Sequence, residues 1–331
     1  MGPKRRTPGT ADATVANDLC QGAGVVLPRR TAAGGPLRVG TLSWNLRRQE
    51  EPEQTVEDFL ESLTATCQNH GECDVVASSG KTVAACPVAG QVLTASGGIP
   101  VVFEAVTVEG TCSWFVASER DGTPALTMLR REQLVNTFDE YWAFPHLAEV
   151  ISAGAGVIRF EDSGLKLVLF ICGENNVPQA TTRTAFLKKT PLALRRRGAL
   201  AEAFSGEWIM LNPAHRPYRR QKIRRGGFLK VGPLRLKDGR TIGRTLQRLV
   251  TNRTYFRDGT HSPVAVVHVN NFDVRQPETV PYASVVFADR EARIRQAEGP
   301  TLGGTGGVEQ GQAASWRYSV YEVQEGVRPT E

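Results

Sequence analysis

A single cysteine stands where one strand of the predicted sheet ends. The run LKLVLFIC (165–172) is almost wholly apolar and therefore predicts a strand covered on both faces. Cys172 closes this run, and the chain then breaks into Gly, Asn and Pro over residues 173–178. Sites in open α/β sheets gather at the carboxyl ends of strands. A thiol in that place is a nucleophile if a base or a positive charge lowers its pKa; otherwise it is a buried, inert thiol.

Other polar residues are expected near the same edge of the sheet. Lys81 follows the apolar run CDVVASS (73–79), and Glu104 lies inside the run PVVFEAVTV (100–108). An acid within an apolar strand is costly unless it faces a site or a partner. Three more polar groups are expected at this edge: Glu174, Asn175 and His215. The plainer alternatives are a solvated loop lysine and an edge-strand glutamate that meets solvent.

Two familiar motifs are only superficially present. The stretch DVVASSGKTV (74–83) ends like a phosphate-binding loop, but the position that must be glycine is Val75, which keeps the chain extended. Four residues have a spacing that resembles zinc ligands: Cys67, His70, Cys73 and Cys86. Cys67 and Cys73 also fit as buried apolar residues, because Cys67 ends the predicted helix and Cys73 opens the next predicted strand. We therefore predict no metal and no cofactor.

The remaining pattern predicts a layered α/β domain. The stretch TVEDFLESLTATC (55–67) carries its apolar residues on one helical stripe, with Thr55 and Asp58 as a capping start. Short apolar runs predict many buried strands with few helices between them. Besides the runs already named, these are 37–46, 112–118, 207–211, 264–270, 282–288 and 316–323, the last preceded by a Gly-rich linker at 299–313.

The segment CGENNVP (172–178) resembles the nucleophile motif of the nitrilase (carbon–nitrogen hydrolase) superfamily, in which a strand ends in Cys-x-Glu-Asn-x-x-Pro or a close variant. The likeness extends in chain order through the predicted strands, over roughly residues 37–326. The resemblance implies a four-layer α-β-β-α sandwich. It also implies hydrolysis of an amide or nitrile through a thioester, with a cysteine nucleophile, a glutamate base and a lysine that stabilises the oxyanion.

The chain departs from this family pattern at two of the three catalytic positions. The glutamate expected at the end of the second strand falls on Gly80, which cannot take a proton. The lysine position holds Arg131, which can stabilise an oxyanion but does not transfer protons. A second family glutamate corresponds to Glu149 in EVISAGAG.

Two hypotheses follow from these departures. In the first, the catalytic set is rearranged, and Lys81, Glu104 and Cys172 provide the three chemical types from exchanged positions. The protein is then a cysteine-dependent amidase-like hydrolase, and acyl transfer to an amine would use the same residues. In the second, the catalytic set has decayed, and the chain is a non-catalytic module on a nitrilase scaffold.

The basic segment 183–257 would be the functional surface of such a module. Residues 181–260 hold 20 Lys and Arg but only four Asp and Glu, although the whole chain has a net charge of only +6. Such asymmetry is typical of a surface that binds nucleic acid or another polyanion, or else of solvated loops or a charge-matched subunit interface.

Around this basic insert we expect a single nitrilase-like domain over residues 36–326, preceded by a disordered arm (1–35) and followed by a tail (327–331). No apolar run is long enough to span a bilayer, and the N-terminus lacks the apolar stretch of a secretory signal. Six cysteines without such a signal predict reduced thiols in the cytoplasm. The expected partners are a small amide or nitrile substrate and, from the resemblance, a second copy in a homodimer, with nucleic acid less favoured and no membrane.

Overall fold

The computed structural model describes residues 24–32, 34–45, 53–67, 72–80, 82–131, 133, 150–172, 174, 204–215, 233–235, 241–243, 263–272, 284–288, 294–303 and 316–326. Within these ranges the helices are α1 (Val56–Cys67) and α2 (Ala89–Ala95). The first strands are β1 (Val25–Leu27), β2 (Leu37–Trp44), β3 (Glu53–Gln54), β4 (Val75–Ser78), β5 (Thr82–Val83), β6 (Val101–Val106), β7 (Cys112–Arg120) and β8 (Thr123–Arg130). The later strands are β9 (Val157–Phe160), β10 (Leu165–Leu169), β11 (Glu207–Ala214), β12 (Pro233–Arg235), β13 (Thr241–Gly243), β14 (Ala265–Asn270), β15 (Ser284–Ala288), β16 (Ile294–Gly303) and β17 (Trp316–Val323).

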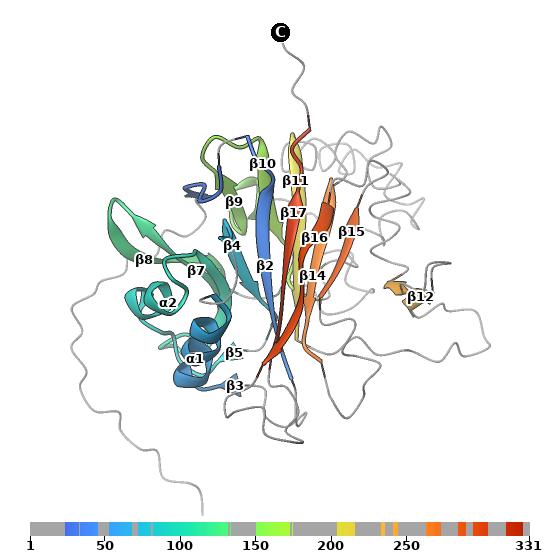
Figure 1. The fold of residues 1–331 in the computed structure, drawn as a ribbon. Coiled ribbons are helices and arrows are strands. Elements are labelled where there is room, and N and C mark those ends of the chain that lie inside the picture. Colours follow the sequence, from blue (N-terminus) through green and yellow to red (C-terminus); the bar gives the residue numbers. More distant parts are fainter. Residues whose placement is uncertain are drawn as a thin grey trace, which may run out of the picture.

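The described strands form two large mixed sheets and a small β12–β13 hairpin (Figure 1). The nine-stranded sheet runs β16-β17-β2-β4-β6-β5-β3, with β7 and β8 added beside β6. The six-stranded sheet runs β1-β9-β10-β11-β14-β15. Parallel pairs lie at the centre of both, with β2, β4 and β6 in one and β10, β11 and β14 in the other. Parallel neighbours place their carboxyl ends at one edge, so this edge of each sheet is where polar side chains can gather.

An apolar core joins the two large sheets face to face. It contains Val102 and Trp114 from the nine-stranded sheet and Leu167, Ile209 and Val267 from the six-stranded sheet, all essentially inaccessible to solvent. Alternate residues of a strand point to opposite faces of its sheet. Glu104 therefore lies on the same face of β6 as Val102, toward the six-stranded sheet.

The described helices cover the other face of the nine-stranded sheet (Figure 1). The predicted capping start is confirmed, because the Asp58 amide donates to the hydroxyl of Thr55 at 3.0 Å. Phe59 and Leu63 of α1 then pack against Phe103 and Phe115 of the sheet. None of the described helices is long and apolar enough to cross a membrane.

An α/β fold built from mixed sheets is thus confirmed. Each apolar run predicted as a strand contains one, and the predicted helix is α1. The described chain shows one helix layer and two sheets, while the fourth layer of a nitrilase-type sandwich stays a prediction. Several strands were not predicted, among them β8 and β9, in which polar or charged residues interrupt the apolar run.

The structure differs from the predicted boundaries at both ends. The segment assigned to the arm contains β1, which pairs in parallel with β9, and the Gly-rich linker begins inside β16. A strand as short as Val25–Leu27 has no periodicity that a sequence pattern can show. Contacts distant in sequence hold it in the sheet.

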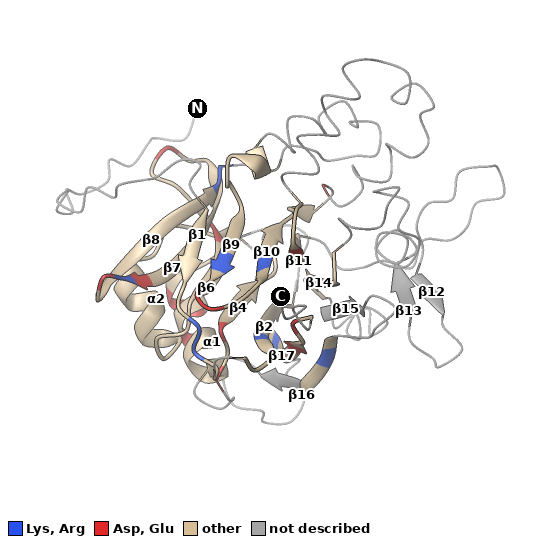
Figure 2. Ribbon diagram, turned by 90° about the horizontal axis from the view of Figure 1, so that it is seen from above, with Lys and Arg blue, Asp and Glu red and all other residues tan. Residues whose placement is uncertain are grey.

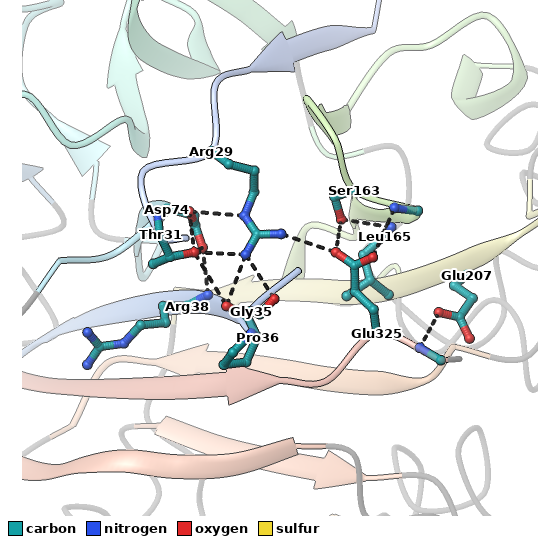
Figure 3. Close-up of polar contacts among 12 residues, drawn as sticks. Arg29, Thr31, Gly35, Pro36, Arg38, Asp74, Ser163, Leu165, Glu207 and Glu325 are labelled. Atoms are coloured by element: carbon teal, nitrogen blue, oxygen red, sulfur yellow. Dashed lines mark hydrogen bonds and ion pairs between the residues drawn. The ribbon is translucent and has the colours of Figure 1, made fainter. Parts of the chain in front are cut away.

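The chain after β1 is fastened by one buried carboxylate, Asp74, at the amino end of β4 (Figure 3). Its oxygens accept from the Arg29 guanidinium at 3.2 Å, from the Thr31 hydroxyl at 2.9 and 3.0 Å, and from three backbone amides, those of Arg30, Thr31 and Arg38. Arg29 also pairs with Glu325 beyond β17 at 3.1 Å. We call Asp74 and its donors the Asp74 clasp; it ties both ends of the described chain to the sheet.

Candidate active site

Cys172 lies in a strained turn just beyond β10. Its φ is 44°, and only three non-glycine residues of the described chain have a positive φ. The left-handed conformation costs a non-glycine residue about 1 kcal/mol or more, so neighbouring contacts must hold it. The Cys172 side chain is half-buried and packs against the core between the sheets.

Two polar side chains hold this turn from opposite sides. The Asn212 amide of β11 donates to the carbonyl oxygens of Phe170 and, at 3.1 Å, of Cys172. The Glu174 carboxylate accepts from the amide of Ile171 at 2.9 Å. The backbone on either side of Cys172 is therefore fixed by side chains from neighbouring segments.

Glu174 is in turn paired with a buried arginine. Arg130 Nη2 lies 2.6 Å from Glu174 Oε1, and both side chains are almost fully buried. Arg130 and Glu104 lie on either side of Trp114 in one row across β8, β7 and β6, since Glu104 pairs with Trp114 and Trp114 with Arg130. Removing one partner of a buried ion pair leaves an uncompensated charge, so this pair links the Cys172 turn firmly to the nine-stranded sheet.

His215, at the end of β11, joins Cys172 to Glu104. His215 Nε2 lies 2.8 Å from Glu104 Oε2 and 3.1 Å from Oε1. The Thr82 hydroxyl donates to Glu104 Oε2 at 2.7 Å, which fixes this carboxylate on its other side. Glu104 is 4% exposed, whereas about a third of the His215 side chain is exposed, at 34%.

The electrostatics of His215 reflect both neighbours. Burial opposes the positive charge of its ring, but hydrogen bonds to Cys172 and Glu104, together with the negative charge of each, outweigh burial and raise the pKa of His215 to about 10. The imidazole therefore carries its proton at neutral pH. A protonated imidazole beside a thiol favours the thiolate, the nucleophilic form of cysteine.

The backbone of His215 is held by a contact between the two sheets. The Asn271 side chain, just after β14, donates to the carbonyl oxygen of His215 at 2.8 Å and accepts from the Ser79 hydroxyl at 2.5 Å. The amide of Gly80, just after β4, donates to the carbonyl oxygen of Ala214 at 3.2 Å. The carboxyl ends of β4, β11 and β14 thus meet at His215.

Of the residues predicted from sequence, four come together here: Cys172, Glu104, His215 and Glu174. Arg131 is exposed at the end of β8, and its carbonyl oxygen accepts from the Ser113 hydroxyl at 2.9 Å. The other three predicted site residues lie outside the described residues: Lys81, Glu149 and Asn175.

Sequence reasoning overlooked the supporting residues of the site and underrated His215. The sequence pattern predicts Arg131, whereas the structure brings Arg130 to the site. If the strand continues, the two arginines must face opposite sides. Thr82, Asn212 and Asn271 carry no motif of their own. Their position in the sequence could have indicated them as site residues, because each lies at or just beyond the carboxyl end of an apolar run.

The described residues offer no cluster of three or more His, Cys, Asp or Glu side chains arranged to hold a metal ion. Cys67 and Cys73 are both buried, and burial together with the neighbouring Cys73 raises the pKa of Cys67 to about 12. Comparisons with protein-family models, with curated proteins and with solved structures found no match.

Proposed function

We propose that this protein is a cysteine-dependent hydrolase of carbon–nitrogen bonds in which Cys172 is the nucleophile, His215 transfers protons and Glu104 orients His215. The observation that carries the proposal is the hydrogen-bonded chain from Glu104 through His215 to Cys172 at the carboxyl ends of the strands. A nucleophile, a base and a third group that orients the base form the recurring arrangement of covalent acyl-transfer catalysis.

Each member has a distinct task in this chemistry. Because Nε2 of His215 faces Glu104, we assign the other ring nitrogen, Nδ1, to Cys172. Glu104, itself held by Thr82, fixes the orientation of the ring and stabilises its positive charge. The resting site is then a thiolate and imidazolium pair, which is nucleophilic below the pKa of about 8.5 of an ordinary thiol.

For an amide substrate, the Cys172 sulfur forms a bond to the carbonyl carbon, and the oxygen takes the negative charge. The tetrahedral intermediate collapses with cleavage of the carbon–nitrogen bond, and the leaving amine takes the proton of His215. The neutral imidazole then removes a proton from water, whose oxygen attacks the thioester. The acid leaves, and the thiolate and imidazolium pair is restored.

The resemblance assigns the oxyanion to Arg131, and this role stays a prediction from sequence, because strand alternation turns the Arg131 side chain away from the face that Arg130 and Glu174 share. Among the described residues no carboxylate pairs with it, and its side chain is exposed at the end of β8. The neighbouring Arg130 is engaged by Glu174 and positions the Cys172 turn instead. A fixed positive charge near the developing oxyanion lowers the barrier of the acyl-transfer step.

The resemblance to the nitrilase superfamily supports the same reaction class. The Cys172 motif follows β10 and precedes β11, in the order that the resemblance implies. In this chain, however, residue 80 is glycine where the family has its glutamate base, and we assign proton transfer to His215 instead. The four-layer sandwich and a catalytic part for Lys81 belong to this proposal as further expectations.

Competitive alkylation of the full chain with chloroacetamide tests the proposal. At about pH 6 we expect Cys172 to be labelled at least about tenfold faster than the exposed Cys112, as measured by peptide mass spectrometry. Burial raises the pKa of Cys67 to about 12 and that of Cys86 to about 11, so both are slow internal references. Labelling of Cys172 no faster than that of Cys112 would remove the basis for a catalytic thiol.

A panel of small amides and nitriles then identifies the reaction. Hydrolysis releases an acid and ammonia or an amine, whereas acyl transfer needs an added amine acceptor for turnover. Replacing Cys172 with serine is expected to lower turnover by about 1,000-fold or more while the midpoint of thermal unfolding stays within a few degrees. Equal turnover by the C172S variant would exclude Cys172 as the nucleophile.

The polyanion-binding alternative stays a prediction from sequence. The segment 183–257 is described only at residues 204–215, 233–235 and 241–243, and on the rest of the described ribbon acidic and basic residues are interspersed (Figure 2). Retention on heparin that falls steeply with added salt would support this alternative, and no retention at low salt would exclude it.

A further inference from the structure

A glycine lies directly against the ring that connects Cys172 to Glu104. A β-carbon built on Gly80 would lie 3.0 Å from Cγ, 3.0 Å from Cδ2 and 3.0 Å from the backbone nitrogen of His215. Such distances are tighter than about nine in ten real contacts of a β-carbon, so His215 must shift by a few tenths of an ångström to admit a side chain at residue 80. Gly80 follows β4, whereas His215 follows β11, and these two strands belong to different sheets.

Backbone conformation does not require a glycine at this position. Glycine is needed where φ lies in the left-handed region, and Gly80 is not among the glycines of the described chain with a positive φ. Any residue could therefore adopt its backbone angles. What distinguishes residue 80 is the space beside it, which the imidazole fills.

The backbone of His215 cannot readily withdraw from an added side chain. Asn271 holds its carbonyl oxygen at 2.8 Å, and the amide of Gly80 itself holds the preceding carbonyl, that of Ala214. Asn271 is in turn fixed by the hydroxyl of Ser79. Because these contacts restrain the main chain, a new methyl group would displace mainly the imidazole ring, while the backbone nitrogen of His215, also 3.0 Å away, shifts by a few tenths of an ångström.

We propose that Gly80 is a positioning residue of the Cys172, His215 and Glu104 set, because its missing side chain leaves the space in which the His215 ring bridges the other two. This inference rests on the proposed function and adds a determinant of its geometry. A methyl group at residue 80 turns the ring away from the Glu104 carboxylate, the Cys172 thiol or both. The three heavy atoms nearest to the added atom all belong to His215, so the disturbance is expected to centre on this residue.

The test is a titration of the His215 ring, observed by nuclear magnetic resonance in full-length protein with isotope-labelled histidine. The chain has five histidines, and the His215→Asn variant assigns the signal. In the wild type we expect a midpoint near the pKa of about 10. In Gly80→Ala we expect the midpoint to fall by about one pH unit or more toward 6.5, and in Gly80→Val by more.

Two glycines provide matched controls. A β-carbon at Gly90 would meet nothing closer than 3.9 Å, so Gly90→Ala adds a methyl group in open space. A β-carbon at Gly40 would lie 2.5 Å from the Tyr318 hydroxyl oxygen, so Gly40→Ala crowds a strand away from the site. Both variants are expected to leave the His215 midpoint unchanged.

An unchanged His215 midpoint in folded Gly80→Ala would overturn the proposal. So would a shift of equal size in Gly40→Ala, because the effect would then be general crowding. If Gly80→Val does not fold, Gly80→Ala still decides the matter, as the smaller substitution. The readout does not depend on turnover: a wild-type protein whose Cys172 is unreactive would contradict the proposed function, whereas the Gly80 titration would still report its own result.

Discussion

Two buried carboxylates of the nine-stranded sheet, Asp74 and Glu104, lie near opposite ends of neighbouring parallel strands. Asp74 accepts from an arginine, a hydroxyl and three backbone amides, none of which titrates between about pH 6 and pH 10 (Figure 3). Glu104 accepts from the Thr82 hydroxyl and faces His215, which does titrate and which contacts a thiol. Burial and charge are alike in the two cases. The two carboxylates differ in their hydrogen-bond partners. Those of Asp74 give it a structural role, whereas His215 makes Glu104 part of the candidate site.

The largest effect is expected for replacement of Asp74, which should lower stability without changing the reactivity of Cys172. Replacing Asp74 with alanine leaves Arg29 and several amide donors without their acceptor, so we expect a loss of about 3 to 5 kcal/mol in the free energy of unfolding. The labelling rate of Cys172 in the remaining folded protein should not change. Glu109→Ala, at an exposed turn, is the control, and denaturant unfolding is the measurement. A loss below about 1 kcal/mol would show that the Asp74 clasp is dispensable.

Replacement of Glu104, the other buried carboxylate, should instead lower the reactivity of Cys172. Glu104→Gln keeps the shape of the side chain but removes the charge that stabilises protonated His215, so we expect Cys172 labelling at about pH 6 to fall about 10- to 100-fold. Glu119→Gln on the exposed end of β7 is the matched control. Undiminished labelling in Glu104→Gln would mean that Glu104, like Asp74, is only structural.

The pH dependence of stability should also distinguish the two carboxylates. The folded-state pKa of His215 is raised from 6.5 to about 10, so its stabilising effect is complete below about pH 6.5 and is lost as the pH rises through 10. The loss should be on the order of 1 to 2 kcal/mol, less than the full shift implies, because about a third of the side chain meets solvent.

Unfolding curves of the wild type and of His215→Asn at about pH 6, 8 and 10 measure this effect. Their difference in unfolding free energy should shrink as the pH rises. The difference between the wild type and Asp74→Ala should stay nearly constant over the same range. A constant difference for His215→Asn would contradict a folded-state pKa near 10.

The smallest effects concern two threonines, each of which donates its hydroxyl to one of these carboxylates. The Thr31 hydroxyl donates to Asp74, and the Thr82 hydroxyl donates to Glu104. Replacing either threonine with valine removes the hydroxyl and should lower the free energy of unfolding by about 1 kcal/mol. Only Thr82→Val should also change the pH dependence of Cys172 labelling, by a few-fold at about pH 6. Equal behaviour of the two variants in labelling would remove the distinction between the two carboxylates.

Much of the fold was readable from local patterns. The apolar run before Cys172 predicted β10, and the stripe and cap of residues 55–67 predicted α1, because burial of one face or of both leaves a clear period in the sequence. By contrast, β1 is held by pairing with β9 and by the Asp74 clasp. Such long-range contacts leave no period, so the predicted arm extended too far along the chain.

The candidate site was readable only in part, for a related reason. Cys172 and Glu104 were conspicuous, as a thiol at a strand end and an acid in an apolar strand. His215 was one polar residue among several, and nothing in the chain between residues 104 and 215 indicates that it would lie 2.8 Å from Glu104. In the sequence, Gly80 is notable only because it stands where the resembling family has a glutamate.

The sequence by itself determined which chemical groups the chain carries and which strands bring them to an edge. Alternating and continuous apolar runs do this locally, through burial. Only the tertiary structure decided that the edges of two sheets meet, so that His215 fills the space beside Gly80 and touches Glu104. The register between sheets depends on packing across the shared core, which involves residues far apart in the chain and has no local signature.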